Sequence, residues 1–173
     1  MKKILIILMA MFVFGLQNVN AQDAPLKIVT NHPDFNIKVK RCAASGKTVI
    51  IDLIFTNEGA NDVSGVSVNG GNGRNYTQWG PSEAYDDEGN IYRNISVRVA
   101  NYQNYTFDET PTIKIPVGVP MKCSVKIEGV DVSAQAIARM ELFVNCKEWA
   151  IGHLGSDATA KPVKFSNIPI TRK

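Results

Sequence analysis

Three cysteines and two histidines are the residues of this 173-residue chain best suited to nucleophilic or zinc chemistry. Cys42, Cys123 and Cys146 lie far apart, and their spacing matches neither a zinc-binding pattern nor a C-x-x-C motif. Cys146 and His153 could pair as nucleophile and base, but Cys146 falls on the apolar phase of its strand, where a thiol is not activated. The sequence contains no G-x-S-x-G or S-x-x-K motif. It therefore predicts no catalytic residues, and an enzyme is the least favoured function class.

Two of the cysteines have a pattern that fits a disulfide. Cys123 and Cys146 both fall on the apolar phase of a predicted strand. If these strands pair antiparallel with Glu128 near Glu141, Cys123 lies opposite Cys146, which predicts a bridge. Two buried free thiols are the alternative of equal standing. Cys42 is out of phase with the apolar residues before it, so it is expected near a hairpin turn as the leftover thiol, and would be reactive only with a lowered pKa.

Four oxygen-bearing side chains share one turn: Asp86, Asp87, Glu88 and Asn90. Calcium prefers such ligands, so these residues are a candidate metal site. However, the D-x-[DN]-x-[DN]-G spacing of an EF-hand loop is absent, and acidic turns in solvent are common. A plain hairpin turn without metal is the expectation, and the sequence predicts no cofactor.

Aromatic residues are concentrated in the segments predicted to be loops. Tyr76, Trp79, Tyr102 and Tyr105 are the candidate ligand-binding residues, because exposed aromatic rings stack on sugars or fill a partner's pocket. The alternative is that they pack at the core or its rim. The nearby Gly-rich stretch 69–75 lacks a G-K-[ST] sequence, so it is expected to be a flexible connection rather than a phosphate cradle.

These residues must be positioned by a β-rich framework. Residues 47–56, KTVIIDLIFT, are the most strand-like stretch, because β-branched and aromatic residues dominate them. One face is wholly apolar (Val49, Ile51, Leu53 and Phe55), and the other carries two isoleucines beside Asp52. A second face that is only partly polar favours a central strand of a packed sheet.

Similar alternation predicts further strands along the chain. In 91–101, Ile91, Ile95, Val97 and Val99 are expected on one face of a single strand. Only residues 132–138 have helical composition, over two turns at most. These patterns predict an all-β fold, an antiparallel sandwich or barrel of eight or nine short strands with at most one short helix. The remaining predicted strands are 35–40, 63–68, 112–116, 121–128, 139–147 and 163–170.

The N-terminal residues are predicted to be a signal peptide that is cleaved after Ala21. Lys2 and Lys3 precede an uncharged apolar run that ends in Val19-Asn20-Ala21. This pattern is typical of Gram-negative export, so the mature protein is expected in the periplasm or at the cell surface, without a membrane span. Residues 22–33 are predicted to form a tether or an edge segment, and residues 34–173 a single sandwich domain.

The charge of the chain gives no indication of a nucleic-acid partner. The formal net charge is +3. Without Lys2 and Lys3, 17 basic residues face 16 acidic ones, so the charge of the mature chain is near +1. Along the sequence the basic residues are dispersed, which argues against nucleic-acid binding.

Three segments resemble immunoglobulin-like extracytoplasmic domains of unknown function in bacteria. They are the strand and turn from Val49 to Gly59, the element DDEGNIY from Asp86 to Tyr92, and IPVGVPMKCSVKI from Ile115 to Ile127. The final VKFSNIPI is similar to the last strand of those domains. The resemblance covers most of residues 35–170. It implies an antiparallel immunoglobulin-like β-sandwich of about 7–9 strands, without catalytic residues.

The expected function is therefore that of an exported binding or adhesion-type module, which recognises a protein or glycan through its loops. The alternative is a structural subunit of an envelope complex that pairs with a partner through an exposed strand edge.

Overall fold

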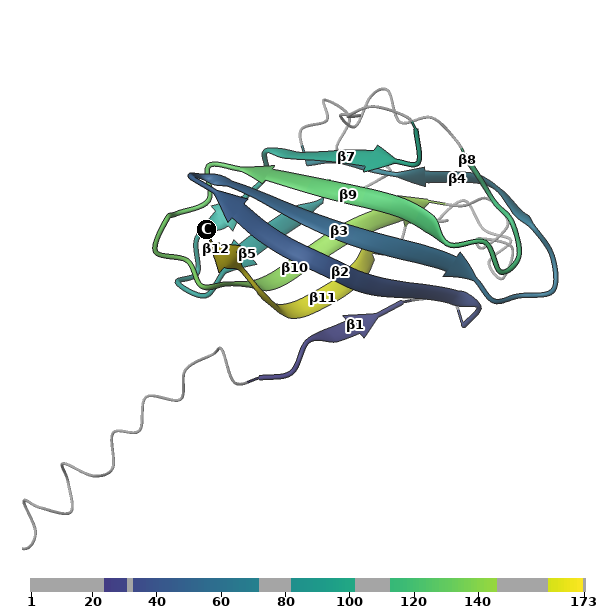
Figure 1. The fold of residues 1–173 in the computed structure, drawn as a ribbon, viewed down its shortest axis with the longest axis horizontal. Helices are drawn as coiled ribbons and strands as arrows, with labels where there is room; N and C mark the ends of the chain where they lie inside the picture. The colour runs from purple at the N-terminus through teal and green to yellow at the C-terminus, as the bar shows by residue number, and fades with distance from the viewer. Residues whose placement is uncertain (1–23, 31–32, 72–81, 102–112, 146–161, 173) are drawn as a thin grey trace, which may run out of the picture.

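The computed structural model describes residues 24–30, 33–71, 82–101, 113–145 and 162–172. These residues form twelve β-strands in two sheets and no helix. Figure 1 shows the two sheets as two layers that face each other. The predicted all-β, antiparallel-rich fold is confirmed.

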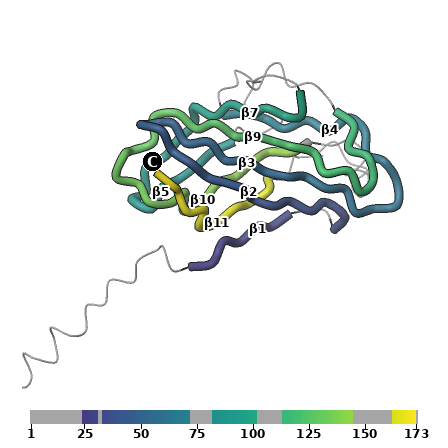
Figure 2. The backbone as a smooth tube through the Cα atoms, in the orientation of Figure 1, coloured from purple at the N-terminus to yellow at the C-terminus, as the bar shows by residue number. Residues whose placement is uncertain are grey.

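The first sheet has five strands in the order β12-β2-β3-β9-β7. Figure 2 shows β7, β9, β3 and β2 side by side from the top of the view downwards. β3 has β2 on one side and β9 on the other, each antiparallel to it, so its predicted central position is confirmed. The strands are β2 (Phe35–Ser45), β3 (Thr48–Asn57), β7 (Ile95–Val99), β9 (Met121–Glu128) and β12 (Thr171–Arg172).

The second sheet has seven strands, along the path β1-β11-β10-β4-β8 with β5 and β6 attached to it. β10 is its long central strand: β11 pairs with one edge, while β5 and β4 share the other. Its members are β1 (Lys27–Val29), β4 (Val63–Val68), β5 (Glu83–Asp86), β6 (Ile91–Tyr92), β8 (Ile113–Ile115), β10 (Ala136–Asn145) and β11 (Pro162–Pro169).

A single buried cluster between the layers draws its residues from both sheets. Phe55 of β3 and Phe165 of β11 are both fully buried, as are Leu53 and Met140. Each such side chain contributes about 1.5–3 kcal/mol relative to leaving it exposed. Since alternate residues of β3 and β10 supply this cluster, the other face of β3 is left to meet solvent.

The number of strands with four or more residues agrees with the predicted number of about 7–9 strands. Eight of the twelve strands have four or more residues, while β1, β6, β8 and β12 have two or three. Residues 132–135 contain no helix, and β10 begins at Ala136. The edge segment predicted near the N-terminus corresponds to β1, which pairs with β11 at the border of its sheet.

The predicted end of the first hairpin strand at Lys40 is wrong, because β2 continues to Ser45. Its register with β3 shifts between Val39 and Arg41, so Lys40 is an extra residue in a β-bulge. The bulge reverses the alternation, since two consecutive residues then lie on the outer side. Cys42 consequently faces the core and is only 6% exposed.

The predicted single strand 91–101 is also wrong, because it is divided into β6 and β7, which belong to different sheets. The chain crosses between the layers at Arg93 and Asn94, and the phase changes there. Tyr92 is therefore buried and Ile91 is 52% exposed, the reverse of the expectation for β6.

The first part of the Gly-rich stretch is packed, contrary to the predicted flexible connection. Asn69, Gly70 and Gly71 are buried, and the Gly71 N–H donates to the Ile95 carbonyl over 2.8 Å. A Cβ on Gly71 would lie 1.9 Å from the carbonyl oxygen of Arg93, so only glycine fits this close approach.

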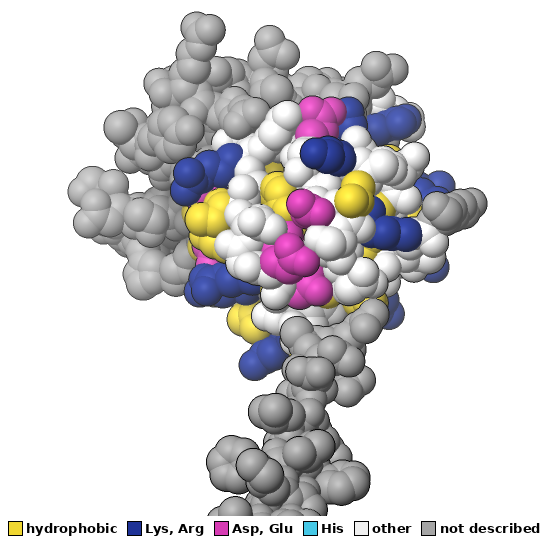
Figure 3. Space-filling model, turned by 90° about the vertical axis from the view of Figure 1, so that its left-hand side faces the viewer, with side chains coloured by type: hydrophobic (Ala, Val, Ile, Leu, Met, Phe, Trp, Pro, Cys, Tyr) yellow, Lys and Arg dark blue, Asp and Glu magenta, His cyan; other side chains and the backbone are white. Residues whose placement is uncertain are grey.

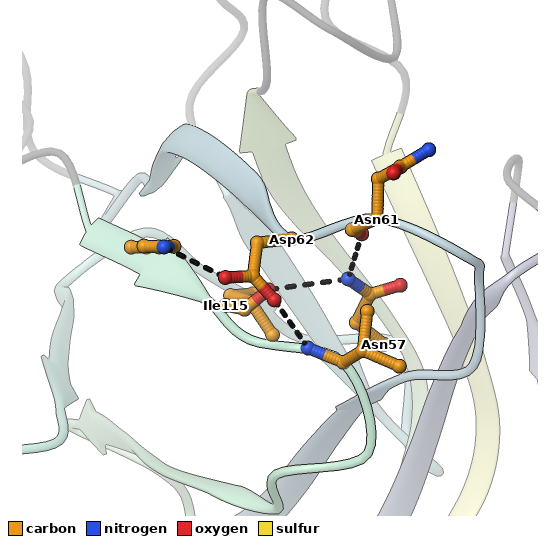
Figure 4. Close-up of polar contacts among 6 residues, drawn as sticks. Asn57, Asn61, Asp62 and Ile115 are labelled. Carbon is orange, nitrogen blue, oxygen red and sulfur yellow. Dashed lines mark hydrogen bonds and ion pairs between the residues drawn. The ribbon is translucent and has the colours of Figure 1, made fainter.

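Asn57 links the two sheets at the end of β3. Figure 4 shows its side chain between Asn61 and Ile115. Its Nδ2 donates to the carbonyl oxygens of Asn61 (2.8 Å) and Ile115 (3.1 Å), and its Oδ1 accepts from the Gly59 N–H. Asn57 is 1% exposed, so these bonds satisfy a buried amide and fix the turn that the sequence predicted here.

Candidate functional site

The acidic turn between β5 and β6 is built around a buried carboxylate. Asp86 is 2% exposed. Its Oδ1 accepts the backbone N–H groups of Glu88 and Asn90, and its Oδ2 accepts Asn90 Nδ2 and, over 2.6 Å, the Tyr92 hydroxyl. Burial raises the pKa of Asp86, but the hydrogen bonds from Tyr92 and Asn90 outweigh it, so its pKa lies below the ordinary value.

Of the other calcium candidates, Asn90 donates its amide N–H to Asp86, and Asp87 has different partners. Asp87 accepts the backbone N–H groups of Gln135 and Ala136, while Glu88 and Asn90 are exposed. Among the described residues, no group of three or more His, Cys, Asp or Glu side chains could hold a metal ion. Figure 3 looks onto this end of the molecule, where acidic side chains gather in the middle and basic ones lie around them. The residues thus form the hydrogen-bonded turn that the sequence predicts, and calcium binding there is not tested.

The predicted aromatic ligand residues, Tyr76, Trp79, Tyr102 and Tyr105, lie outside the described residues. Tyr92, by contrast, is a packing residue. Its hydroxyl bonds Asp86 and accepts the Asp131 N–H over 3.1 Å.

The strand pairing on which the disulfide prediction depended is wrong. β9 pairs with β3 and β7, whereas β10 pairs with β11, β4 and β5, so the two strands belong to different sheets. Two-residue periodicity assigns a residue to a face but does not say which strands are neighbours. Cys123 is buried, and Cys146 lies outside the described residues, so the bridge itself is not tested.

Neither described cysteine is suited to nucleophilic chemistry. Burial raises the pKa of the Cys42 thiol to about 12, which outweighs the opposing effect of Arg172. Burial also raises the pKa of Cys123 strongly. The lowered pKa that a reactive Cys42 requires is therefore absent.

A concavity of about 440 Å³ lies on the outer face of the five-stranded sheet. We call this face, made by β2, β3, β9 and β7, the basic face. Three cations surround the hollow: Lys40 from the bulge of β2, Arg98 from β7 and Lys122 from β9. Its other outward lining residues are Asp52, Ile54, Ala100 and Ser124.

The strand register explains how these side chains come together. In one row across the sheet, Lys38 and Lys122 lie on either side of Ile54. Because neighbouring strands are about 4.8 Å apart, the backbones of these two lysines are roughly 10 Å apart. In the next row, Ser124 lies between Asp52 and Arg98.

The basic face carries more positive charge than the sequence suggested. Among the described residues it holds six cations and two acids, which leaves a net charge of four. Arg41 pairs with Asp52, and Lys126 with Glu128. The cations that form no ion pair with another described residue are Lys38, Lys40, Arg98 and Lys122.

The basic residues are dispersed along the sequence, but the fold brings six of them onto one face of a sheet. Residues 22–173 have a net charge near +1, so the remainder of that segment carries about three negative charges. Lys38, Lys40, Arg98 and Lys122 are all exposed, so they attract anions from solution.

Asp52 is the one acid among the described lining residues. Its Oδ2 binds Arg41 at 2.8–2.9 Å, and its Oδ1 accepts the Ser124 hydroxyl over 3.0 Å. This arrangement fixes the carboxylate beside the hollow while leaving lone pairs on both Asp52 and Ser124 for a ligand.

One rim of the hollow has an unusual backbone. Ala100 adopts φ of 51°, a conformation that L-residues other than glycine rarely take. Its N–H donates to the Lys122 carbonyl over 2.9 Å, so Ala100 is still bonded to β9. The small Ala100 side chain lies in the lining with Arg98 and Lys122.

This site was missed by sequence reasoning, which searched for function in the loops. A partial signal was present, because Lys38, Lys40, Lys122 and Arg98 all occupy polar phases of predicted strands. What the sequence lacked was the strand order that makes these residues neighbours.

Among the described residues, no helix is long and apolar enough to cross a membrane. No known family model matches the chain, and no curated protein shows significant similarity to it.

Proposed function

We propose that this protein is a non-catalytic binding module that holds a protein or glycan ligand in the hollow of the basic face. The observation that carries the proposal is the concavity of about 440 Å³ itself. Its volume falls within the range of ligand sites, about 300–1,000 Å³. Charged, polar and aliphatic side chains from four adjacent strands surround it.

The position of the hollow supports the proposal. Its lining residues belong to the regular, hydrogen-bonded part of a sheet, where backbone geometry is fixed by neighbours on both sides of β3 and β9. A site on strands is held more rigidly than a site on loops, so less conformational entropy is lost on binding.

Filling the hollow tests the proposal. Ser124 is half-buried at an outward position of β9, so Ser124→Tyr places a ring in the hollow without changing the core. A ligand found on a glycan array or among envelope proteins should lose most of its affinity for this variant. Thr56→Tyr is the control, because Thr56 also faces outward from β3 but does not line the hollow. Equal binding by Ser124→Tyr and wild type would contradict the proposal.

Export belongs to the same proposal. The leader pattern of residues 1–21 and the resemblance to extracytoplasmic immunoglobulin-like domains both support a protein that acts in the periplasm or at the cell surface. Mass spectrometry of the protein recovered from the envelope should give an N-terminus at Gln22. A chain that retains Met1 in the cytoplasm would contradict this part.

A second function, assembly through a strand edge, has its own supporting observation. β2 has eleven residues, but β12 pairs with its outer edge only at Ala43 and Ala44. Within the described part of the chain, no other strand pairs with that edge. An edge of this kind accepts a partner's strand. The Glu58 N–H donates to the Asp34 carbonyl, so residues 34, 36 and 38 bond β3, and the N–H groups of residues 35, 37 and 39 point to the free edge. Val39 is half-buried, so Val39→Pro removes an edge donor while leaving the β2–β3 hydrogen bonds in place. Loss of an oligomer or partner complex in Val39→Pro, with retained melting behaviour, would favour this function.

A further inference from the structure

We propose that the ligand of the basic face is an acidic glycan, an oligosaccharide that carries uronate carboxylates. This inference rests on the proposed function and specifies its ligand class. It combines three features of the lining: the cations, the acceptor beside them and the small aliphatic surface between them.

The cations require an anionic ligand. Lys40, Arg98 and Lys122 approach the hollow from three different strands, and Lys38 extends the positive charge beyond it. None of them forms an ion pair with another described residue. A neutral ligand would leave their mutual repulsion in place, whereas a carboxylate would offset it and form charge-assisted hydrogen bonds with Arg98. The distance of roughly 10 Å between the backbones of Lys38 and Lys122 suits charges that are spaced along an extended chain.

Asp52 indicates that the ligand also donates hydrogen bonds. A carboxylate beside three cations would repel a ligand that offers only acidic groups. A sugar ring offers hydroxyl groups, which can donate to Asp52 while its acid group meets the cations. The Ser124 hydroxyl already donates to Asp52, so its free lone pairs accept from the same kind of ligand.

The aliphatic part of the lining fits the C–H face of a sugar. Ile54 is half-buried between Lys38 and Lys122, and Ala100 contributes a methyl group at the rim. Both present small apolar side chains. An acidic peptide would also satisfy the cations, but its backbone offers one N–H donor per residue, whereas a sugar ring offers several hydroxyl donors to Asp52 and Ser124.

The decisive experiment compares three probes by isothermal titration with the purified protein at low salt. The probes are a galacturonate oligomer, the same oligomer with its carboxylates methyl-esterified, and a poly-glutamate peptide of equal charge. We expect binding of the acidic oligomer, at least about tenfold weaker binding of the ester, and weaker binding of the peptide. Affinity for the acidic oligomer should also fall as salt rises, because the contacts are exposed.

Variants of matched charge locate the binding. Lys122→Glu should weaken the acidic oligomer at least about tenfold, since it replaces an attraction in the hollow with a repulsion. Lys164→Glu makes the same change of charge at an exposed position of β11, in the other sheet, and should leave binding within about twofold. The melting curve of Lys122→Glu should match that of the wild type, because Lys122 is exposed.

The outcomes separate this inference from the function on which it rests. Equal binding of the ester overturns the requirement for the acid, and equal effects of Lys122→Glu and Lys164→Glu overturn the site. Stronger binding of the peptide overturns the glycan. Binding of none of the three probes also overturns the inference. In each case, the Ser124→Tyr experiment with a ligand from the envelope still decides whether the hollow binds anything.

Discussion

Asp86→Asn is the substitution whose effect the structure specifies most closely. The amide oxygen of asparagine can keep the two backbone N–H donors that bind Oδ1, at 3.0 and 2.8 Å. The amide nitrogen would then take the place of Oδ2. It would face two further donors, Asn90 Nδ2 at 2.9 Å and the Tyr92 hydroxyl at 2.6 Å. The change removes one charge and reverses one hydrogen-bonding direction at almost constant volume.

The expected loss of stability follows from those two contacts. A hydrogen bond to a charged group contributes about 1.5–3 kcal/mol. Asn90 is exposed and can turn to water, so its share is at the lower end. The Tyr92 hydroxyl is buried and already accepts the Asp131 N–H, so it finds no equivalent partner. A loss of about 2–4 kcal/mol is expected, which corresponds to roughly 5–15 °C in Tm for a domain of this size.

Thermal and urea unfolding measure this loss, and a double-mutant cycle with Tyr92→Phe measures the shared bond. The coupling between the two positions should be about 1 kcal/mol or more. Glu88→Gln is the matched control in the same turn, because Glu88 is exposed; its effect should stay within about 0.5 kcal/mol. If Asp86→Asn melts within about 2 °C of the wild type, the carboxylate does not stabilise the turn and the argument fails.

The same carboxylate gives a pH dependence of defined sign. Burial opposes ionisation of Asp86, but the hydrogen bonds from Tyr92 and Asn90 prevail and set its folded pKa below the ordinary 3.8. A lowered folded pKa means that the stabilisation is fully present above the unfolded pKa and is lost as pH falls through the folded pKa. The difference in unfolding free energy between wild type and Asp86→Asn should therefore be constant at neutral pH and shrink below about pH 4.

Three other perturbations have clear expected outcomes. Leu53→Asp should abolish cooperative melting, because an unpaired carboxylate in the core costs about 3–5 kcal/mol. Its control, Ile54→Asp on the basic face, should fold. A soluble, cooperatively melting Leu53→Asp protein would show that Leu53 does not lie in the core. Cys42 should react with iodoacetamide at pH 8 about 1,000-fold more slowly in the native state than after unfolding, because its pKa is raised from 9.0 to about 12. Cys123 should be protected as well. Rapid alkylation of the native protein would contradict the burial of both thiols. Deletion of Lys40 should restore plain alternation in β2 and lower the free energy of unfolding, measured in urea, by only about 1–2 kcal/mol. An unfolded deletion variant would show that Lys40 is not an extra residue in the register of β2 with β3.

Much of the fold could be predicted because its signals are local. The central position of β3 followed from one apolar face and one mixed face within ten residues. The turn at Asn57 and the hairpin turn at Asp86 were likewise visible in short motifs. Each of these depends on residues a few positions apart, for which side-chain periodicity and turn chemistry are sufficient.

The wrong strand predictions have one physical cause: the alternation of inward and outward residues changes at positions that no local sequence pattern marks. The bulge at Lys40 moved Cys42 from the predicted surface into the core. The crossing after Tyr92 divided an apparently continuous strand between two sheets. At Lys40 one extra residue shifts the register of β2, and after Tyr92 the chain passes from one sheet to the other.

The candidate site depends on the same bulge. In a regular continuation of β2, Arg41 would point into the core, where an unpaired guanidinium is costly. The extra residue instead places both Lys40 and Arg41 on the outer face, where Arg41 binds Asp52 and Lys40 lines the hollow. Arg41 thus partly neutralises the one acid among the described lining residues. Plain alternation would also place Lys40 outward, so the effect of the bulge on the charge of this face is the addition of Arg41. The irregularity that made Cys42 unpredictable therefore also sets the charge around Asp52 beside the hollow.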